Sequence, residues 1–239
     1  MTPLLELKGV HTHIGAYHIL HGVDLVVPRG QLTMLLGRNG AGKTTTLRTI
    51  MGLWRASQGR IDFNGQDITQ AATPQIAGRG IAYVPENMGI FAGLTVRENL
   101  VLAARNAALQ EQRLERIFRL FPAMQKFWHT LAGNLSGGQK QMLAISRAIV
   151  EPRKLLLIDE PTKGLAPAII GAMIEAFAEL KRDTTLLVVE QNFHFASSLG
   201  DAVAVMDAGR IVHTGSMRDL AADDALQQRL LGLSLESHQ

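Results

Sequence analysis

The chain has 239 residues, of which 46% are hydrophobic and 19% charged, and its 24 Lys and Arg residues nearly balance 21 Asp and Glu residues. This composition supports a sizeable buried core and excludes wholesale disorder, and a formal net charge of +3 gives no reason to expect nucleic acid as a partner. The absence of cysteine excludes disulfides, thiolate catalysis and cysteine-ligated zinc. We expect no signal peptide and no run of the ~18–20 apolar residues that cross a bilayer, so membrane contact should go through a partner protein.

Short aliphatic runs alternate with amphipathic stretches along most of the chain, which is typical of an α/β protein with a mostly parallel sheet. The alternation in residues 23–27 predicts an exposed antiparallel strand, and residues 61–63 run into the hairpin turn Asn64-Gly65. A second hairpin turn is expected at residues 207–209. Buried strands are predicted at residues 32–36, 81–84, 155–158, 186–189 and 202–206. The predicted architecture is an N-terminal antiparallel β layer on a parallel core.

Helix signals dominate the middle of the chain. A capping box at residues 95–98 predicts a helix through about Ala108, and apolar residues share one face of residues 114–121 before a stop at Pro122. The region from about 92 to 150 is therefore predicted to be a helical subdomain inserted into an α/β core made of residues 1–91 and 151–239. Together they should form one domain.

Two helices are expected in the last part of the chain. Pro167 should begin a helix whose face carrying Ile170, Met173, Ile174 and Phe177 packs on the sheet. The last twenty residues look helical but are poorly specified.

Residues 37–44, Gly-Arg-Asn-Gly-Ala-Gly-Lys-Thr, match the phosphate-loop pattern G-x-x-x-x-G-K-[ST] between a predicted strand and a helix-forming stretch. The glycines let backbone N–H groups approach a phosphate, and the helix N-terminus adds its dipole. Lys43 should reach the β- and γ-phosphates, and the Thr44 hydroxyl should bind Mg²⁺. We therefore predict a nucleotide site made by Gly37, Arg38, Asn39, Gly40, Ala41, Gly42, Lys43, Thr44 and Thr45.

A predicted buried strand at residues 155–158 ends in two acids, Asp159 and Glu160. Asp159 is placed to hold the metal ion, usually through water, and Glu160 could polarise a water toward the γ-phosphate as a general base. Standing alone, two such acids would be read as solvating a strand end. Their combination with the phosphate loop favours the catalytic interpretation.

The segment Leu135-Ser136-Gly137-Gly138-Gln139 opens a predicted helix with a serine and two glycines, which makes a second phosphate-binding device. One chain needs only one such device for the γ-phosphate of its own nucleotide. We therefore expect the second device to serve the nucleotide of another chain, in a head-to-tail dimer. In it, Ser136, Gly137, Gly138 and Gln139 of each chain close the nucleotide of the other. The simpler alternative is a capping box that only starts a helix.

These three motifs, in this order, resemble the ATP-binding-cassette (ABC) ATPase family over essentially the whole chain. Residues 84–86, 94–100, 160–167 and 189–192 further resemble the LivF-like ATPase subunits of branched-chain amino-acid importers. The resemblance implies a P-loop nucleotide-binding domain that uses ATP and Mg²⁺ and couples ATP hydrolysis to transport. Urea, short amides or another small polar solute are alternative cargoes, and a soluble, non-transport ABC ATPase is the alternative of a different class.

The resemblance also implies partners. These are transmembrane permease subunits, a second and paralogous ABC ATPase subunit (or a second copy in isolation), and indirectly a solute-binding protein. The chain should then lie at the cytoplasmic face of the inner membrane, held there by the permeases. The insert between Phe91 and Leu131, with Glu86 at its root, is expected to bear the groove that receives a short permease helix.

At two positions beside the predicted γ-phosphate the chain departs from the general family pattern. Glu86 stands where the family usually has a glutamine that senses Mg²⁺, so we group it with Thr44 and Asp159 as a metal residue. Gln191 stands where the family usually has a switch histidine, and it is predicted to position groups beside Glu160. Both departures are habitual in the LivF-like group.

The adenine contact is less clear. The family's stacking aromatic corresponds to Ile14, and Tyr17 follows three residues later. Either Tyr17 stacks on adenine or Ile14 supports it, and packing of Tyr17 on the β layer is an equally good interpretation. Nearby, His11, His13, His18 and His21 lack the spacing of metal ligands on a helix, so no metal site is expected there.

Overall fold

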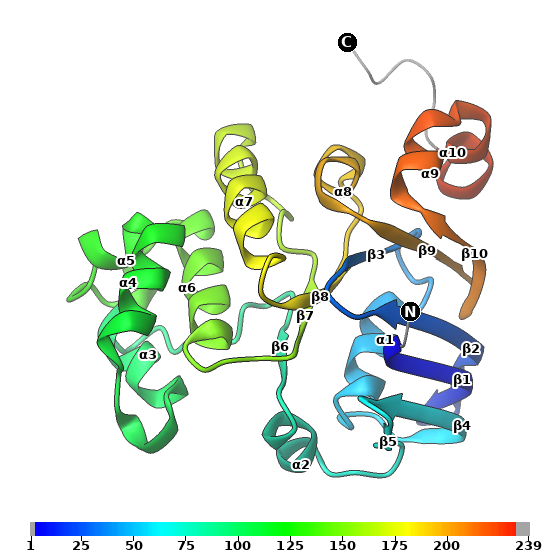
Figure 1. Ribbon diagram of the computed structural model, residues 1–239, viewed down its shortest axis with the longest axis horizontal. Helices are drawn as coiled ribbons and strands as arrows, with labels where there is room; N and C mark the ends of the chain where they lie inside the picture. Colours follow the sequence, from blue (N-terminus) through cyan, green and yellow to red (C-terminus); the bar gives the residue numbers. More distant parts are fainter. Residues whose placement is uncertain (1–2, 233–239) are drawn as a thin grey trace.

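The computed structural model describes residues 3–232, apart from the side chain of Asn106, and its strands form two sheets (Figure 1). The antiparallel sheet has the order β2-β1-β4-β5, and the core sheet has the order β10-β9-β3-β8-β7-β6. Strands β9, β3, β8, β7 and β6 run parallel, whereas β10 is antiparallel to β9. The predicted antiparallel layer on a mostly parallel core is confirmed. The strands are β1 (Pro3–Ile14), β2 (Tyr17–Pro28), β3 (Leu32–Leu36), β4 (Ala56–Phe63), β5 (Gln66–Asp67), β6 (Ile81–Val84), β7 (Leu155–Asp159), β8 (Thr185–Val189), β9 (Ala202–Asp207) and β10 (Arg210–Ser216).

The core sheet is covered on both faces, which explains why its strands read as continuous apolar runs. Every residue of β3, β7 and β8 is buried. Successive side chains point to opposite faces, so Leu156 joins the hydrophobic cluster with the helices and Leu157 joins the cluster under the antiparallel sheet. The core sheet is therefore rigidly held where its carboxyl ends present the site.

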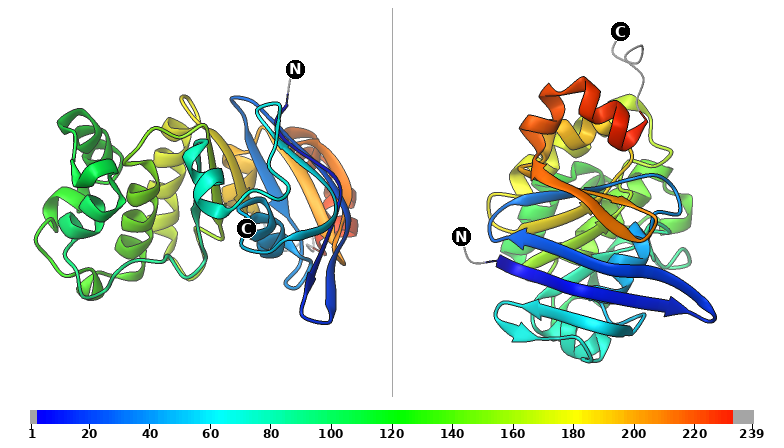
Figure 2. Two further views of the ribbon diagram at one scale, coloured as in Figure 1. Left: turned by 90° about the horizontal axis from the view of Figure 1, so that it is seen from below. Right: turned by 90° about the vertical axis from the view of Figure 1, so that its right-hand side faces the viewer.

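The helices lie on both sides of the core sheet and beyond its end (Figures 1 and 2). Helix α1 packs in the cluster between the two sheets, and α3 to α6 gather at the end of the molecule away from the antiparallel sheet. The helices are α1 (Lys43–Ile50), α2 (Thr73–Gly78), α3 (Val96–Ala103), α4 (Glu111–Leu120), α5 (Pro122–Lys126), α6 (Gly137–Ile149), α7 (Pro167–Leu180), α8 (Phe193–Leu199), α9 (Met217–Ala222) and α10 (Asp224–Leu231), with 3₁₀ turns at Arg105–Ala107 and Ala132–Asn134.

Several predicted helix boundaries need correction. The predicted capping box closes at Thr95 and Glu98, but α3 ends at Ala103 rather than near Ala108, because Ala104 is extended and a 3₁₀ turn follows. Pro122 begins α5 as well as ending the preceding helix, since proline is well suited to a first helical turn.

The predicted packing face of α7 is only partly right. Met173 and Phe177 are fully buried, while Ile170 and Ile174 are half-buried at the edge of the same cluster. The expectation of a helical C-terminus holds for α9 and α10. Residues 233–239 lie outside the described residues.

The hairpin turns lie where they were predicted. Asn64 and Gly65, both with positive φ, join β4 to β5, and Ala208 and Gly209 do the same between β9 and β10. The predicted exposed strand at residues 23–27 belongs to β2, but it is exposed on one side only. Its apolar alternation faces the cluster between the sheets, and those side chains are buried.

Candidate nucleotide site

The phosphate loop joins the carboxyl end of β3 to the N-terminus of α1. Gly37 and Gly42 have φ of 145° and 107°, and a Cβ on Gly37 would lie 2.2 Å from the carbonyl oxygen of Met206. Only glycine fits such a backbone at this distance. The loop wraps around its own lysine, because Lys43 Nζ donates to the carbonyl oxygens of Gly37 at 2.6 Å and Arg38 at 3.0 Å.

Lys43 is buried near several carboxylates. Burial lowers its pKa from the ordinary value, and the charges of Glu160 and Asp159 oppose that shift. A buried amine held by carbonyl oxygens alone is under-compensated. An incoming phosphate oxygen would supply the missing negative charge at this position.

Asp159 ends β7 beside the start of α1 and is completely buried. Its Oδ1 accepts a hydrogen bond from Thr44 Oγ1 at 3.1 Å, and its Oδ2 accepts one from Tyr83 Oη at 3.2 Å. Burial raises the pKa of Asp159 above its ordinary value despite these two donors. Burial, together with the Asp159 charge, raises the pKa of Tyr83 to about 12, so this phenol remains a donor.

Glu160 follows in a left-handed conformation, with φ of 48°, which turns its side chain away from the strand direction. Gln191 Nε2 donates to Glu160 Oε1 at 2.5 Å, and Lys163 Nζ lies 3.4 Å from Glu160 Oε2. The same ammonium lies 2.6 Å from Glu86 Oε1. The structure thus brings Glu86, Glu160 and Gln191 together, with Lys163 as the cation between the two carboxylates.

Glu190 is a site residue that the sequence analysis did not single out, because it appears there only within the motif at residues 189–192. It is buried, its Oε1 accepts from the N–H and hydroxyl of Thr162, and its Oε2 accepts from the N–H groups of Gln191 and Asn192. It thereby ties the loop after β7 to the loop after β8. The sequence did carry a signal for Glu190, since it is an acid directly after a buried aliphatic strand, as Asp159 is.

The predicted phosphate-binding residues line two adjoining hollows. The first, of about 340 Å³, is lined by residues 39–45 together with Ile19, Glu86, Glu160 and Lys163. The second, of about 250 Å³, is lined by residues 36–39 and by Glu190, Gln191, Phe193 and Leu231. Arg38 and Gln191 therefore face the second hollow, and Asp159 reaches the first through Thr44.

Tyr17 lines neither hollow. It lies next to the β1–β2 turn and is 75% exposed. Ile19, which the sequence reasoning did not single out, is the residue of this hairpin that lines the larger hollow. An aliphatic side chain therefore occupies the wall that Tyr17 was expected to share.

Ser136 to Gln139 also lie away from both hollows of their own chain. Ser136 caps α6 reciprocally with Gln139, with distances of 2.9 Å and 3.3 Å for the two hydrogen bonds. Gly138 is where α6 meets α7, because a Cβ there would lie 2.8 Å from Ile169 Cγ2. The capping box predicted at this position is real, and a phosphate contact from it would have to involve another chain.

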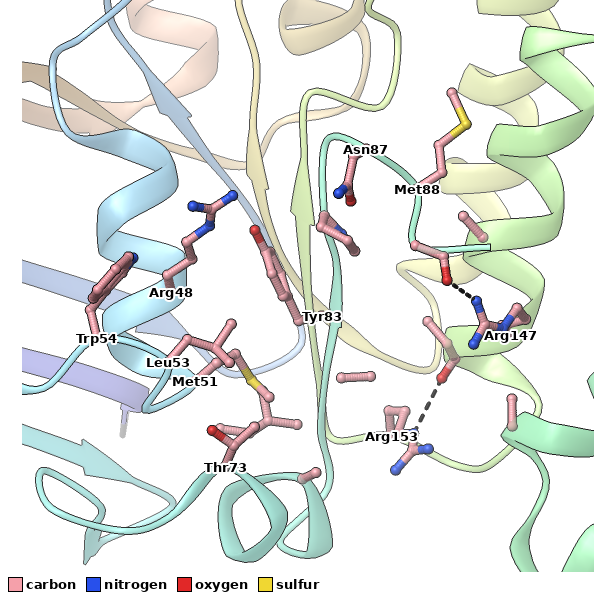
Figure 3. A pocket seen from close by; sticks show the side chains of 18 residues that line it. Arg48, Met51, Leu53, Trp54, Thr73, Tyr83, Asn87, Met88, Arg147 and Arg153 are labelled. Carbon is pink, nitrogen blue, oxygen red and sulfur yellow. Dashed lines mark hydrogen bonds between the residues drawn. The ribbon is translucent and has the colours of Figure 1, made fainter. Parts of the chain in front are cut away.

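A larger groove of about 670 Å³ lies between the core and the helices α3 and α6 (Figure 3). Arg48, Trp54 and Tyr83 line its core side, and Arg147 and Arg153 line its helical side. Tyr83 therefore belongs both to this groove and to the hydrogen bonds around the buried acid of the nucleotide site. Within the described residues, no helix combines the length and apolarity needed to span a membrane.

Comparison with known proteins agrees with this geometry. Residues 20–163 match the family model of ABC transporters. The chain is 36% identical to the high-affinity branched-chain amino acid transport ATP-binding protein BraG of Pseudomonas aeruginosa, over 96% of this chain and all of BraG. It is 34% identical to a probable branched-chain amino acid transport ATP-binding protein, LivF of Archaeoglobus fulgidus (90% and 93% covered), and 32% identical to the lipopolysaccharide export protein LptB of Haemophilus influenzae (90% and 91%).

Among solved structures, a nucleotide-free ATP-binding cassette from an ABC transporter superimposes with a TM-score of 0.82 at 25% identity, covering 98% of this chain and all of that one. The family match spans more than half of the chain, and the two relatives of highest stated identity match over nearly their whole lengths. Members of this family are ATPases that work with transmembrane permease components. The chain belongs to the ABC transporter family, as an ATP-binding subunit whose ATP hydrolysis is coupled to transport.

Proposed function

We propose that this ATPase energises the import of branched-chain amino acids, as its relatives BraG and LivF are named for doing. The observation that carries the proposal is the group around Lys163. Its ammonium contacts Glu86 and Glu160, and Glu160 accepts from Gln191. Glu86 and Gln191 both depart from the general family pattern, and the resemblance makes both departures habitual in the LivF-like group. This supports the importer over the exporter likeness.

The donor set around Asp159 fits Mg²⁺. Thr44 Oγ1 and Asp159 Oδ1 are 3.1 Å apart, close to the ~2.9 Å that separates neighbouring oxygens around an octahedral Mg²⁺. Two oxygen donors beside a cavity that admits phosphates are the usual protein share of such a site. Thr44, Asp159 and Glu86 would hold Mg²⁺ directly or through water, and the ion would supply positive charge to the phosphates.

Hydrolysis needs a base and a group that orients the water. We assign the base to Glu160, whose carboxylate lies in the wall of the larger hollow, and the orienting role to Gln191. Lys43 would exchange its contacts with loop carbonyls for the β- and γ-phosphates. The adenine would rest against Ile19 and Ile14, with Tyr17 a second candidate at the hairpin tip.

We expect a second ATPase chain to cover the open side of the nucleotide hollow. Ser136, Gly137, Gly138 and Gln139 do not line the hollow of their own chain. A head-to-tail partner would place the same segment over this nucleotide, with its helix N-terminus toward the γ-phosphate. We propose a paralogous partner, in a heterodimer, with a second copy of the chain as the substitute in isolation.

The permease would dock in the groove of about 670 Å³ between the core and the helices α3 and α6. This position differs from the expected insert between Phe91 and Leu131, because the core supplies one wall. Among the described residues, Trp54 Nε1 and Arg147 Nε are buried without a hydrogen-bond partner, and both side chains line this groove. The permeases would hold the chain at the cytoplasmic face of the inner membrane, and a solute-binding protein would deliver the cargo.

The test is uptake by the reconstituted transporter. Vesicles carrying the permeases, the paralogous ATPase and this chain should take up leucine, isoleucine or valine with external binding protein, and should exclude urea and short amides. The Lys43→Ala variant should lose Mg-ATP binding in calorimetry and should support no uptake, because Lys43 is the phosphate-loop cation that would neutralise the β- and γ-phosphates. Uptake of urea in place of leucine would refute the cargo, and undiminished ATP binding by Lys43→Ala would refute the phosphate site.

Cross-linking tests the docking groove separately. The chain has no native cysteine, so a single introduced cysteine reports on one position. Leu53 lines the groove and is 50% exposed, and Val212 on β10 is 51% exposed but lies outside it. Leu53→Cys should cross-link to a permease and Val212→Cys should not. The reverse pattern would place the permease elsewhere.

A further inference from the structure

Four histidines form a cluster on the β1–β2 hairpin, which we call the histidine cluster: His11 and His13 on β1, His18 and His21 on β2. His11 faces His21 across the strands, and His13 faces His18. The ring of His18 lies 4.0 Å from that of His21, 4.2 Å from that of His13 and 5.2 Å from that of His11, between ring centroids. The ring of His18 is thus at the centre of the group, with the three other imidazole rings around it.

The cluster lies on the face of the hairpin that the core does not use. Thr12 and Leu20, which alternate with the cluster in β1 and β2, are completely buried, whereas His13 and His18 are exposed. His11 and His21 are half-buried, and none of the four histidines is among the buried residues. Core packing therefore does not explain why imidazoles occupy these positions.

One pair of ring nitrogens already lies about as close as two ligands on one cation. His11 Nδ1 and His18 Nε2 share a hydrogen bond at 3.0 Å, and a cation between them would replace the shared proton. With metal–nitrogen bonds of about 2.0–2.1 Å, two imidazole nitrogens on one ion are separated by roughly 2.9 Å at a right angle and roughly 3.4 Å at a tetrahedral angle. The observed distance lies within that range.

A third ligand is also partly oriented. His13 Nδ1 is 3.1 Å from Ser57 Oγ on β4, which fixes that nitrogen and leaves Nε2 free to bind. A hydrogen bond to the second ring nitrogen is how metal-binding histidines are usually held. Within the described residues, no three imidazoles or carboxylates converge on one point as they stand, so the exposed ring of His13 must turn to reach the ion.

We propose that the histidine cluster is a binding site for one borderline divalent cation, Zn²⁺, Ni²⁺ or Cu²⁺, held by His11 and His18 with His13 and His21 completing the coordination. Imidazole is a good ligand for these ions and a poor one for Mg²⁺ or Ca²⁺, which take oxygen. The site is separate from the Mg²⁺ ligands proposed at the nucleotide, and it does not depend on the proposed function. The site includes residues of both strands, so the bound ion would cross-link β1 and β2. This would stabilise the hairpin whose Ile19 lines the nucleotide hollow.

The surroundings of His21 favour the neutral form of that side chain. Partial burial lowers the pKa of His21, and the charges of His18, Arg210, His11 and His13 lower it further. Metal binding requires neutral imidazole, so acidification should release the ion. With two imidazole ligands, the affinity should fall by up to ~100-fold per pH unit in the range where protons displace the ion from both.

The test is calorimetric titration of the untagged full-length chain with ZnCl₂ and NiCl₂ at pH 7.5 and pH 5.5, in the absence of nucleotide. We expect one ion per chain, a higher melting temperature with the ion bound, and loss of most of the affinity at the lower pH. The double variant His11→Gln, His18→Gln should bind at least tenfold more weakly and lose the melting shift. Imidazole proton signals in NMR should show which rings the ion contacts.

Two matched variants separate this site from others. His194 is exposed on α8 and outside the cluster, so His194→Gln should bind zinc as the parent does. Asp159→Asn, which removes a predicted Mg²⁺ ligand, should also leave the zinc affinity unchanged. Failure to bind one ion per chain, unchanged affinity in the folded double variant, or loss of the ion in either matched variant would overturn the proposal.

Discussion

The contact between Gln191 and Glu160 predicts unequal effects of replacing the two residues. Gln191 donates to one carboxylate oxygen of Glu160 at 2.5 Å, and Lys163 lies 3.4 Å from the other. A glutamine amide stays uncharged across the working pH range, so it can orient the carboxylate or a water but cannot accept the proton. Glu160→Gln should therefore bind ATP and lose nearly all turnover, whereas Gln191→Ala should remain measurably active.

The magnitudes follow from what each change removes. Loss of a general base costs ~10²–10⁴-fold in rate. A hydrogen bond to a charged group contributes about 1.5–3 kcal/mol, which is roughly 10- to 150-fold. Gln191 is exposed and Glu160 retains Lys163 as a second support, so we expect the lower end, about tenfold.

The assay is ATP turnover in the assembled complex, where partner chains complete both sites, with ATP binding measured in parallel. Gln125→Ala, an exposed glutamine on α5, is the matched control and should turn over ATP at the parent rate. The reasoning fails if Gln191→Ala binds ATP yet is as inactive as Glu160→Gln. It fails equally if Glu160→Gln keeps more than a tenth of the parent rate.

Three further predictions concern folding and the buried acids. Gly37→Ala should lower the melting temperature far more than Gly40→Ala. A Cβ at position 37 would collide with the backbone of Met206, whereas a Cβ at position 40 would meet open space and cost only the ~1–2 kcal/mol of holding alanine at a positive φ. Asp159 has a raised pKa, so its ionisation opposes folding as the pH rises through that pKa. In the absence of Mg²⁺, Asp159→Asn should therefore raise the melting temperature of the protein at pH 8 but not at pH 3. Glu190→Ala should leave four donors without an acceptor and cost more than ~3 kcal/mol in denaturant unfolding, with Glu190→Gln failing to rescue it because an amide is itself half donor.

The phosphate loop could be predicted because its chemistry is local. The loop is one continuous stretch, and its glycines, its lysine and the helix that follows are adjacent in sequence. The same holds for Asp159, which a buried strand delivers to the carboxyl edge of a parallel sheet. Contacts of Lys163 with Glu86 and of Glu190 with Thr162 depend on which strands are neighbours. That order, β8-β7-β6, is set by packing of the whole sheet and is not written in any one segment.

The histidine cluster shows how one residue of register changes a prediction. A regular strand with a period of two would put His18 and His21, three positions apart, on opposite faces. Pairing shifts by one residue between Thr12 and His13, so that the strand opposite accommodates Ile19 as an extra residue. The irregularity returns His18 to the face of His21 and leaves Ile19 at the wall of the nucleotide hollow. Helical ligand spacing says nothing about residues on strands, and a strand period of two would not have brought these histidines together either, because the position of the bulge decides it.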